Sequence, residues 1–121
     1  MKVSMPRGTA HGWGVAGEQL SREIALLPPL DGVTLHGIRT VALDPFDPAA
    51  WDRHNIGYCF FEDTITVLDY TRQAAKNWDI IVAGSSWCEQ HLRIGGVRNT
   101  TTILQGVDAS TFYPGPKRNL A

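Results

Sequence analysis

The sequence predicts an α/β fold, a single Rossmann-like domain in which about five parallel strands are flanked by helices. Short apolar runs of strand length alternate with segments that carry apolar residues at helical spacing, an order typical of parallel sheets with right-handed crossovers. The run at residues 56–61 (IGYCFF) is almost continuously apolar, as in strands buried on both faces. The length of 121 residues suits one domain and leaves no room for two ordinary ones.

The first predicted unit combines a strand, a glycine-rich loop and a helix. Residues 2–5 (KVSM) are the strand, and residues 6–17 (PRGTAHGWGVAG) are expected to be a turn-rich loop. A helix is predicted over residues 19–27, where leucine and isoleucine recur at helical spacing. Pro28 and Pro29 end it, because proline cannot continue a helix.

Strands and helices alternate along the rest of the chain. A proline-rich loop is expected at residues 44–51. One helix is predicted to begin at Asp63 or Thr64 and to use Trp78 on its apolar face. Another is predicted to begin at Ser85 or Ser86 and to end near Ile94, before Gly95 and Gly96. The remaining strands are predicted at residues 33–38, which 41–43 can extend, and at 56–61, 79–83 and 100–104.

Composition excludes several classes of protein. Hydrophobic content of 43% and charged content of 19% are those of a soluble globular domain. The net charge is −1 and the longest basic run is the pair Lys117 and Arg118, so we expect no nucleic-acid partner. No apolar stretch has the length of a signal peptide or a transmembrane helix. Cys59 and Cys88 lack CxxC spacing, which favours a reducing cytoplasm, although a disulfide between them stays open.

Ligands of parallel sheets bind beyond the carboxyl ends of the strands, near the switch in strand order. Glycines allow close approach of a ligand to the backbone, and the N-terminus of a following helix favours an anion. The residues predicted to lie near a phosphate are Gly12, Trp13, Gly14 and Val15, and His11 of the same loop is a catalytic candidate. A tight strand-to-helix turn without a ligand is the alternative, since the match to G-x-G-x-x-G at residues 12–17 is weak without a well-placed acidic residue after the second strand.

Glu62 follows the third predicted strand and is the other catalytic candidate, for proton transfer or for orienting a hydroxyl. The side chains expected to line the cleft are Asp63, Ser85, Ser86, Gln105, Gly106 and Asp108. Asp63 and the serines can equally cap helices, and Trp87 can pack on the sheet. The histidines have no ligand spacing, so no metal site is expected.

The segment at residues 77–114 (NWDIIVAGSSWCEQHLRIGGVRNTTTILQGVDASTFYP) carries a set of motifs in a fixed order. It resembles the family 4-type glycosyltransferases of the GT-B fold, as do residues 12–27 and 56–63, whereas residues 39–54 match poorly. The residues that carry the resemblance in this segment are Asp79, Ser85, Ser86, Trp87, Leu92, Gly96, Val97, Gly106, Val107, Asp108, Phe112 and Pro114.

The resemblance implies the N-terminal, acceptor-side half of a two-domain enzyme, with residues 1–115 as the domain and 116–121 as a tail. It implies that residues 12–15 approach the donor diphosphate, that Glu62 lies on the acceptor side and that residues 106–108 lead to the second domain. The family's donor-binding domain uses two glutamates at a fixed spacing that no glutamate pair of this chain reproduces. No cofactor is expected, and a nucleotide-sugar donor would need that second domain.

Sugar transfer requires an aligned donor and acceptor and a stabilised leaving diphosphate, so this chain alone is expected to be weakly active or inactive. The expected partners are a small-molecule or glycan acceptor and either a second domain or a second copy of the chain. Two alternatives stay open. One is a non-catalytic module on the same scaffold, self-associating as a homodimer or binding a ligand. The other is a generic Rossmann-type nucleotide-binding protein.

Overall fold

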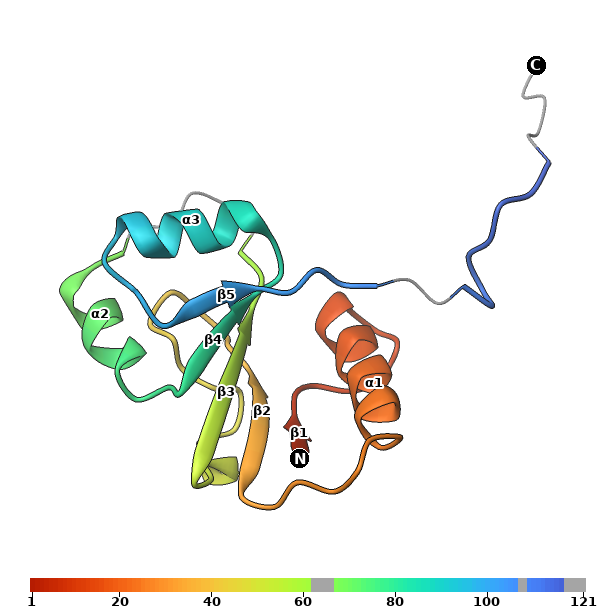
Figure 1. Ribbon diagram of the computed structural model, residues 1–121, viewed down its shortest axis with the longest axis horizontal. Coiled ribbons are helices and arrows are strands. Elements are labelled where there is room, and N and C mark those ends of the chain that lie inside the picture. The colour runs from red at the N-terminus through yellow and green to blue at the C-terminus, as the bar shows by residue number, and fades with distance from the viewer. Residues whose placement is uncertain (62–66, 107–108, 117–121) are drawn as a thin grey trace.

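The computed structural model of the chain is a five-stranded parallel sheet with helices on both faces (Figure 1). It describes residues 1–61, 67–106 and 109–116. The strands are β1 (Lys2–Ser4), β2 (Val33–Gly37), β3 (His54–Cys59), β4 (Ile80–Ala83) and β5 (Thr100–Thr102). The helices of these described ranges are α1 (Gly12–Ile24), α2 (Asp69–Ala75), α3 (Ser86–Ile94) and the short 3₁₀ helix η1 (Pro48–Ala50). The predicted α/β fold is confirmed.

All neighbouring strands pair in parallel, and their order in the sheet is their order in the sequence. The sheet therefore contains no reversal of strand order, and the expected switch point is absent from it. The short β5 ends at Thr102, but the amide of Ile103 still donates to the carbonyl of Ala83 at 3.1 Å. Thr101 and Thr102 lie beside Val82 and Ala83, so the chain leaves the sheet next to the carboxyl end of β4.

Each face of the sheet has its own hydrophobic core, because successive strand residues point to opposite faces. In β3, Tyr58 lies in the core under α1, whereas Cys59 lies in the core under α2 and α3. In β4, Val82 and Ala83 divide between the two cores in the same way. Trp13, Leu20 and Ile24 of α1 cover the first core, and Ala75, Cys88 and Leu92 belong to the second.

The two faces require crossovers of opposite hand. The connections β1–α1–β2 and β3–α2–β4 advance in the same direction across the sheet, yet α1 lies on the opposite face from α2 and α3 (Figure 1). Parallel crossovers are right-handed in about 98% of cases. These two cannot share a hand, so the prediction of right-handed crossovers throughout is wrong for one of them. Among the described helices, α1 is therefore the one that covers the core on its face.

The helix α1 begins at Gly12, so the prediction of a loop up to residue 17 is wrong. His11 is the N-cap, and its Nδ1 accepts a hydrogen bond from the Gly14 amide at 3.1 Å. Gly14 and Gly17 are buried because the preceding segment runs against the helix. A Cβ on Gly17 would stand 2.0 Å from the carbonyl oxygen of Pro6, which explains glycine inside a helix.

The other helices differ from the prediction mainly at α2. α2 starts at Asp69, after its N-cap Leu68, and the predicted start at Asp63 or Thr64 lies outside the described residues. Trp78 lies beyond the end of α2, where its indole Nε1 donates to the carbonyl of Leu43 at 3.0 Å. The α3 prediction is confirmed, with Ser85 as the cap that accepts from the Cys88 amide at 3.1 Å. Trp87 is 38% exposed, and the centroid of its ring lies 4.0 Å from that of His91.

The bounds of two strands also differ slightly from the prediction. The strand predicted at residues 56–61 begins earlier, at His54, and ends at Cys59. Residues 41–43 do not extend β2 but belong to a turn, closed by a bridge between Ile38 and Pro45. Among the described residues, no helix has the length and apolar character needed to cross a membrane.

Candidate functional site

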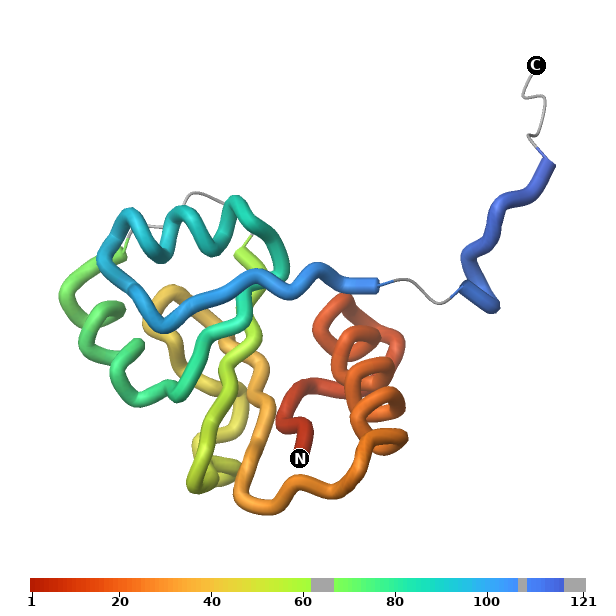
Figure 2. Tube along the Cα trace, in the orientation of Figure 1, coloured from red at the N-terminus to blue at the C-terminus, as the bar shows by residue number. Residues whose placement is uncertain are grey.

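A cavity of about 770 Å³ lies between α1 and the segment that follows β5. Figure 2 shows this segment running past the N-terminal end of α1. Its volume lies in the range of about 300–1,000 Å³ that small-molecule sites span. The residues that line it are Gly12, Val15, Ala16, Gln19, Leu20, Arg22, Glu23, Tyr58, Ile103, Leu104, Gln105, Gly106 and Ala109.

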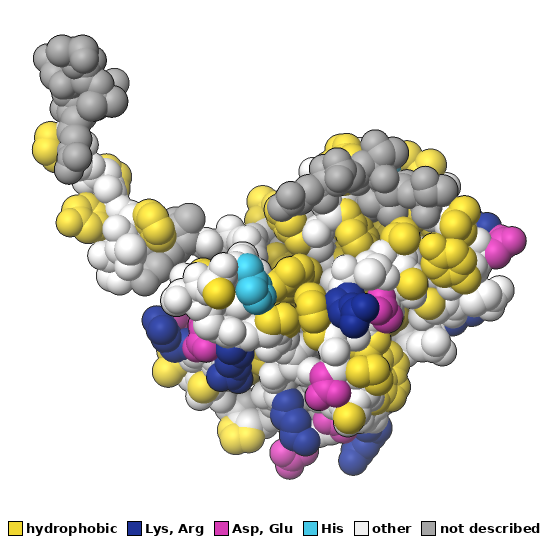
Figure 3. Space-filling model, turned by 180° about the vertical axis from the view of Figure 1, so that it is seen from behind, with side chains coloured by type: hydrophobic (Ala, Val, Ile, Leu, Met, Phe, Trp, Pro, Cys, Tyr) yellow, Lys and Arg dark blue, Asp and Glu magenta, His cyan; other side chains and the backbone are white. Residues whose placement is uncertain are grey.

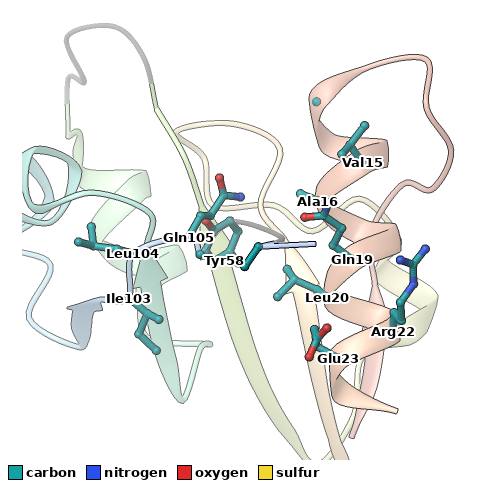
Figure 4. A pocket seen from close by; sticks show the side chains of 13 residues that line it. Val15, Ala16, Gln19, Leu20, Arg22, Glu23, Tyr58, Ile103, Leu104 and Gln105 are labelled. Carbon is teal, nitrogen blue, oxygen red and sulfur yellow. The ribbon is translucent and has the colours of Figure 1, made fainter. Parts of the chain in front are cut away.

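One wall is the side of α1. Leu20 and Glu23 point from the helix toward the space that faces Tyr58 (Figure 4). Val15 and Ala16 continue this wall toward the start of the helix, and Val15 is 40% exposed. Residues at positions i, i+1, i+4 and i+5 share one side of a helix, so this wall follows from the helical period.

The opposite wall is the chain just after β5. Ile103 and Leu104 line it and are 59% and 71% exposed, which is high for large apolar side chains. Gln105 and Gly106 extend the same wall toward Gly12. Two segments that are 80 or more residues apart in the sequence thus form one cavity.

Tyr58 of β3 lines the cavity between its two walls. The residue is 6% exposed, and its ring lies 6.1 Å from that of Trp13 in an edge-to-face arrangement. Its hydroxyl is buried, and the side chain of Gln105 lies close enough to interact with it. Burial raises the pKa of Tyr58 above its ordinary value, because the phenolate would lose its hydration.

The Tyr58 hydroxyl is enclosed by its own chain. A Cβ at Gly84 would stand 2.9 Å from it. The hydroxyl itself has almost no accessible surface, so the ring of Tyr58, and not the hydroxyl, is the part of this side chain that can meet the cavity.

The glycine segment divides between the cavity and the core. Gly12 and Val15 line the cavity. Trp13 turns instead toward Phe46, at 5.3 Å between ring centroids, and toward Tyr58. A Cβ on Gly14 would stand 2.5 Å from the Gly8 carbonyl oxygen, so Gly14 faces its own chain. His11 is exposed and its Nδ1 is engaged as the helix cap.

The other predicted site residues also separate. Gln105 and Gly106 line the cavity, as the prediction placed them at the cleft. Ser85 caps α3, and Ser86 begins that helix outside the cavity lining. Glu62, Asp63 and Asp108 lie outside the described residues. Of the predicted site residues that the structure describes, the cavity therefore brings together Gly12 and Val15 of the glycine segment with Gln105 and Gly106 after β5.

The sequence prediction missed Tyr58 and the apolar walls. Tyr58 stands in an otherwise apolar run, and a hydroxyl there is the one signal that sequence offered. Ile103 and Leu104 were predicted to be part of a strand, and in a strand of the sheet we expected their side chains to be buried. Leu20 was predicted only as one of the apolar residues that recur at helical spacing in the first helix.

The described residues contain no group of three or more His, Cys, Asp or Glu side chains that could hold a metal ion. Cys59 and Cys88 are both buried and free, with their sulfurs 3.7 Å apart under α3. The hydrogen bond between them, together with burial, raises the pKa of the Cys59 thiol. This pair lies on the face of the sheet opposite the cavity.

Charge on the surface is mixed. On the face seen from behind, exposed hydrophobic side chains are interspersed with side chains of both charges, and neither sign dominates (Figure 3). The charged residues that line the cavity are Arg22 and Glu23, which are adjacent in sequence and opposite in charge. The lining therefore has no strong electrostatic preference for an anion or a cation.

The fold and the cavity define a Rossmann-like α/β domain with an apolar groove of ligand size beside its first helix. No protein family, curated protein or solved structure matches the chain.

Proposed function

We propose that this chain is the acceptor-side half of a nucleotide-sugar-dependent glycosyltransferase and is inactive by itself. The observation that carries the proposal is the cavity that joins the start of α1 to residues 103–106. Both segments follow the carboxyl ends of strands, where parallel sheets bind ligands. The resemblance of residues 12–27 and 77–114 to GT-B enzymes concerns the same two parts of the chain.

The composition of the cavity favours an acceptor over a donor. A nucleotide-sugar donor carries a diphosphate, which is stabilised in transfer by cations or by several hydrogen-bond donors. Arg22 is the one basic residue in the described lining, and the carboxylate of Glu23 lies next to it in sequence. The first turn of α1 offers the amides of Gly12 and Trp13, whereas His11 takes those of Gly14 and Val15. Donor binding therefore belongs to a second domain.

The chain can contribute binding and orientation to the reaction. The acceptor would lie along α1 with its reacting hydroxyl directed toward the second domain, which holds the donor. Alignment of the two reactants lowers the barrier by removing the entropic cost of their encounter. Neither half is expected to perform this alignment by itself.

A fusion experiment tests the proposal. The chain is assayed for hexose transfer from UDP-glucose and GDP-mannose, alone and fused after residue 116 to donor-binding domains of GT-B enzymes. We expect no transfer by the chain alone and transfer by at least one fusion. Transfer by the unfused chain would contradict its being half an enzyme. Inactivity of every fusion whose donor domain still binds its nucleotide would contradict the acceptor role.

A self-associating module is the second candidate, favoured by the exposure of large apolar side chains at the end of the chain. Ile103, Leu104, Phe112 and Tyr113 are each more than half exposed. Association would cover such a surface. Light scattering over a hundredfold range of concentration distinguishes the candidates, because a module predicts a dimer and the acceptor half predicts a monomer that binds small molecules.

A further inference from the structure

We infer that Cys59 and Cys88 are a redox-sensitive pair, which a small peroxide closes to a disulfide between the carboxyl end of β3 and the first turn of α3. The pair lies on the face of the sheet opposite the cavity, and its chemistry requires nothing of the proposed glycosyl transfer. The two residues are the only cysteines of the chain, and both thiols are free.

The fold brings the two sulfurs into contact. Their Sγ atoms lie 3.7 Å apart, although the residues are 29 positions apart in the sequence. Cys59 is the last residue of β3, and Cys88 lies in the first turn of α3, where its amide donates a hydrogen bond to the N-cap Ser85. Because the sulfurs of a disulfide are about 2 Å apart, this pair needs to close by about 1.7 Å, a movement on the scale of a side-chain adjustment.

The surroundings of the pair suit a disulfide. Both cysteines are completely buried, in the core that also contains Ala83 and Leu92. A disulfide has no S–H group, so oxidation leaves no hydrogen-bond donor without a partner in this apolar core. Burial also keeps reducing thiols away from the bond, because thiol–disulfide exchange requires access to a sulfur. We therefore expect the disulfide to persist once it has formed.

Cys88 is the nucleophile of the pair. It lies in the first turn of α3, where the positive end of the helix dipole favours a thiolate. The hydrogen bond with Cys59, together with one from the backbone of Phe61, lowers the pKa of the Cys88 thiol against the opposing effect of burial. The same hydrogen bond and burial raise the pKa of Cys59, which therefore stays protonated and acts as the donor.

The reaction balances with hydrogen peroxide as the oxidant. The Cys88 thiolate attacks a peroxide oxygen, the O–O bond breaks, and the departing hydroxide takes up the proton that Cys88 released, which gives water and a sulfenic acid. The Cys59 sulfur then attacks the Cys88 sulfur, and the hydroxyl leaves with the Cys59 proton as a second water. The two thiols lose two electrons, which reduce the peroxide. A molecule of this size needs only a local opening of the core to reach the sulfurs.

Peroxide treatment of the reduced, folded chain tests the inference. After the excess peroxide is removed, the chain is unfolded in urea with iodoacetamide and analysed by mass spectrometry. We expect no alkylation before reduction, alkylation of both cysteines after it, and a cross-linked peptide that joins residues 59 and 88. The oxidised chain should melt about 8 °C above the reduced chain, because the bond closes a long loop in the unfolded state.

Cys59→Ala and Cys88→Ala are matched controls, because peroxide also oxidises methionine and the chain contains two. Neither variant should gain stability on peroxide treatment. Dimedone, added as the treated chains are unfolded in urea, traps a sulfenic acid that has no second cysteine to react with. We expect an adduct on Cys88 in the Cys59 variant and none on Cys59 in the Cys88 variant, because only the Cys88 thiol has a lowered pKa.

Three results with the parent chain would overturn the inference. The first is that both cysteines of the folded chain remain open to alkylation after peroxide treatment, whereas the chain treated in urea forms the disulfide, which would make the pair ordinary core packing. The second is a cross-link between two chains, seen as a dimer in non-reducing electrophoresis. The third is an internal disulfide that fails to raise the melting temperature, which would show that the folded core does not accommodate the bond. A dimedone adduct on Cys59 alone would overturn the assignment of Cys88 as the nucleophile.

Discussion

Gly17 sets how closely α1 approaches the chain that precedes it. The position is helical and buried, and the Pro6 carbonyl oxygen stands 2.0 Å from where a Cβ would be. Backbone atoms cannot move aside as the end of a flexible side chain can. The glycine therefore serves packing between two backbone segments, and this role requires no ligand.

We predict that Gly17→Ala destabilises the chain by about 3 kcal/mol, because the new methyl group forces α1 away from the segment before it. Gly12→Ala is the control, since a Cβ at Gly12 meets nothing within 4 Å. It should change the free energy of unfolding by less than about 0.5 kcal/mol. Urea denaturation measures both. Equal stability of the two variants would show that the helix does not pack as closely as described.

Residue-scale packing also explains why the start of α1 was mispredicted. Glycine lowers helix propensity by about 1 kcal/mol relative to alanine, so three glycines at positions 12–17 favour a loop. Tertiary packing outweighs this preference at Gly14 and Gly17, where any larger side chain would collide with the backbone. His11 did not indicate that a helix begins at Gly12, because Ser, Thr, Asp and Asn are the usual N-cap residues.

At the scale of elements, the amino ends of β3 and β4 are joined by Asp79. The Asp79 Oδ2 accepts a hydrogen bond from the backbone N–H of Asn55 at 2.7 Å, and the backbone N–H of Asp79 donates to the backbone carbonyl of Asn55 at 3.0 Å. His54 lies 3.5 Å from the other carboxylate oxygen. The hydrogen bond from the Asn55 amide, with help from His54, lowers the pKa of Asp79 below its ordinary value.

This lowered pKa predicts the direction of a pH effect. Because folding favours the ionised form, the contribution of Asp79 is present above the ordinary aspartate value of 3.8 and is lost as the pH falls below it. Asp79→Asn should lower the melting temperature near neutral pH and show a smaller further drop than the parent chain on acidification to about pH 3. Asp31→Asn, at an exposed position before β2, is the control. Parallel acid curves for the parent chain and the Asp79 variant would contradict the assignment.

The elements that sequence predicted best are those whose signals are local. The helix α3 has a serine cap, apolar Leu92 at the core and two glycines at its end, and each of these signals acts within one or two turns. Strand positions in β3 and β4 were also recognisable from their apolar runs. The end of β5 was not, because Ile103 and Leu104 have strand-like side chains but lie beyond the last paired strand residue.

At the scale of the whole molecule, the order of the strands and the location of the groove could not be predicted. Alternation of strands and helices specifies a parallel sheet but not which strands are neighbours or which face each helix covers. The cavity depends on both, because its lining combines α1, Tyr58 of β3 and the chain that follows β5. Tyr58 lines the cavity because α1 packs over β3, and the sequence does not specify this packing.

A single sheet shared by two cores predicts cooperative unfolding of the described domain. Adjacent residues of β3 belong to opposite cores, so neither core can lose its packing while the strand stays in place. Leu92 is completely buried under α3, and Leu92→Ala should cost about 3 kcal/mol through lost contacts and a cavity. Leu20→Ala, in the core on the other face, should cost less because Leu20 is only partly buried.

Both substitutions should shift one and the same transition. Urea curves recorded by tryptophan fluorescence and by far-ultraviolet circular dichroism should coincide in the parent chain and in each variant, with unchanged steepness. Trp13 reports on one core and Trp78 on the other, so fluorescence samples both faces. Two separate transitions, of which Leu20→Ala shifted one and Leu92→Ala the other, would show that the faces unfold independently. The groove would then belong to a part of the molecule that can open by itself, and ligand binding would stabilise only the transition that Leu20→Ala shifts.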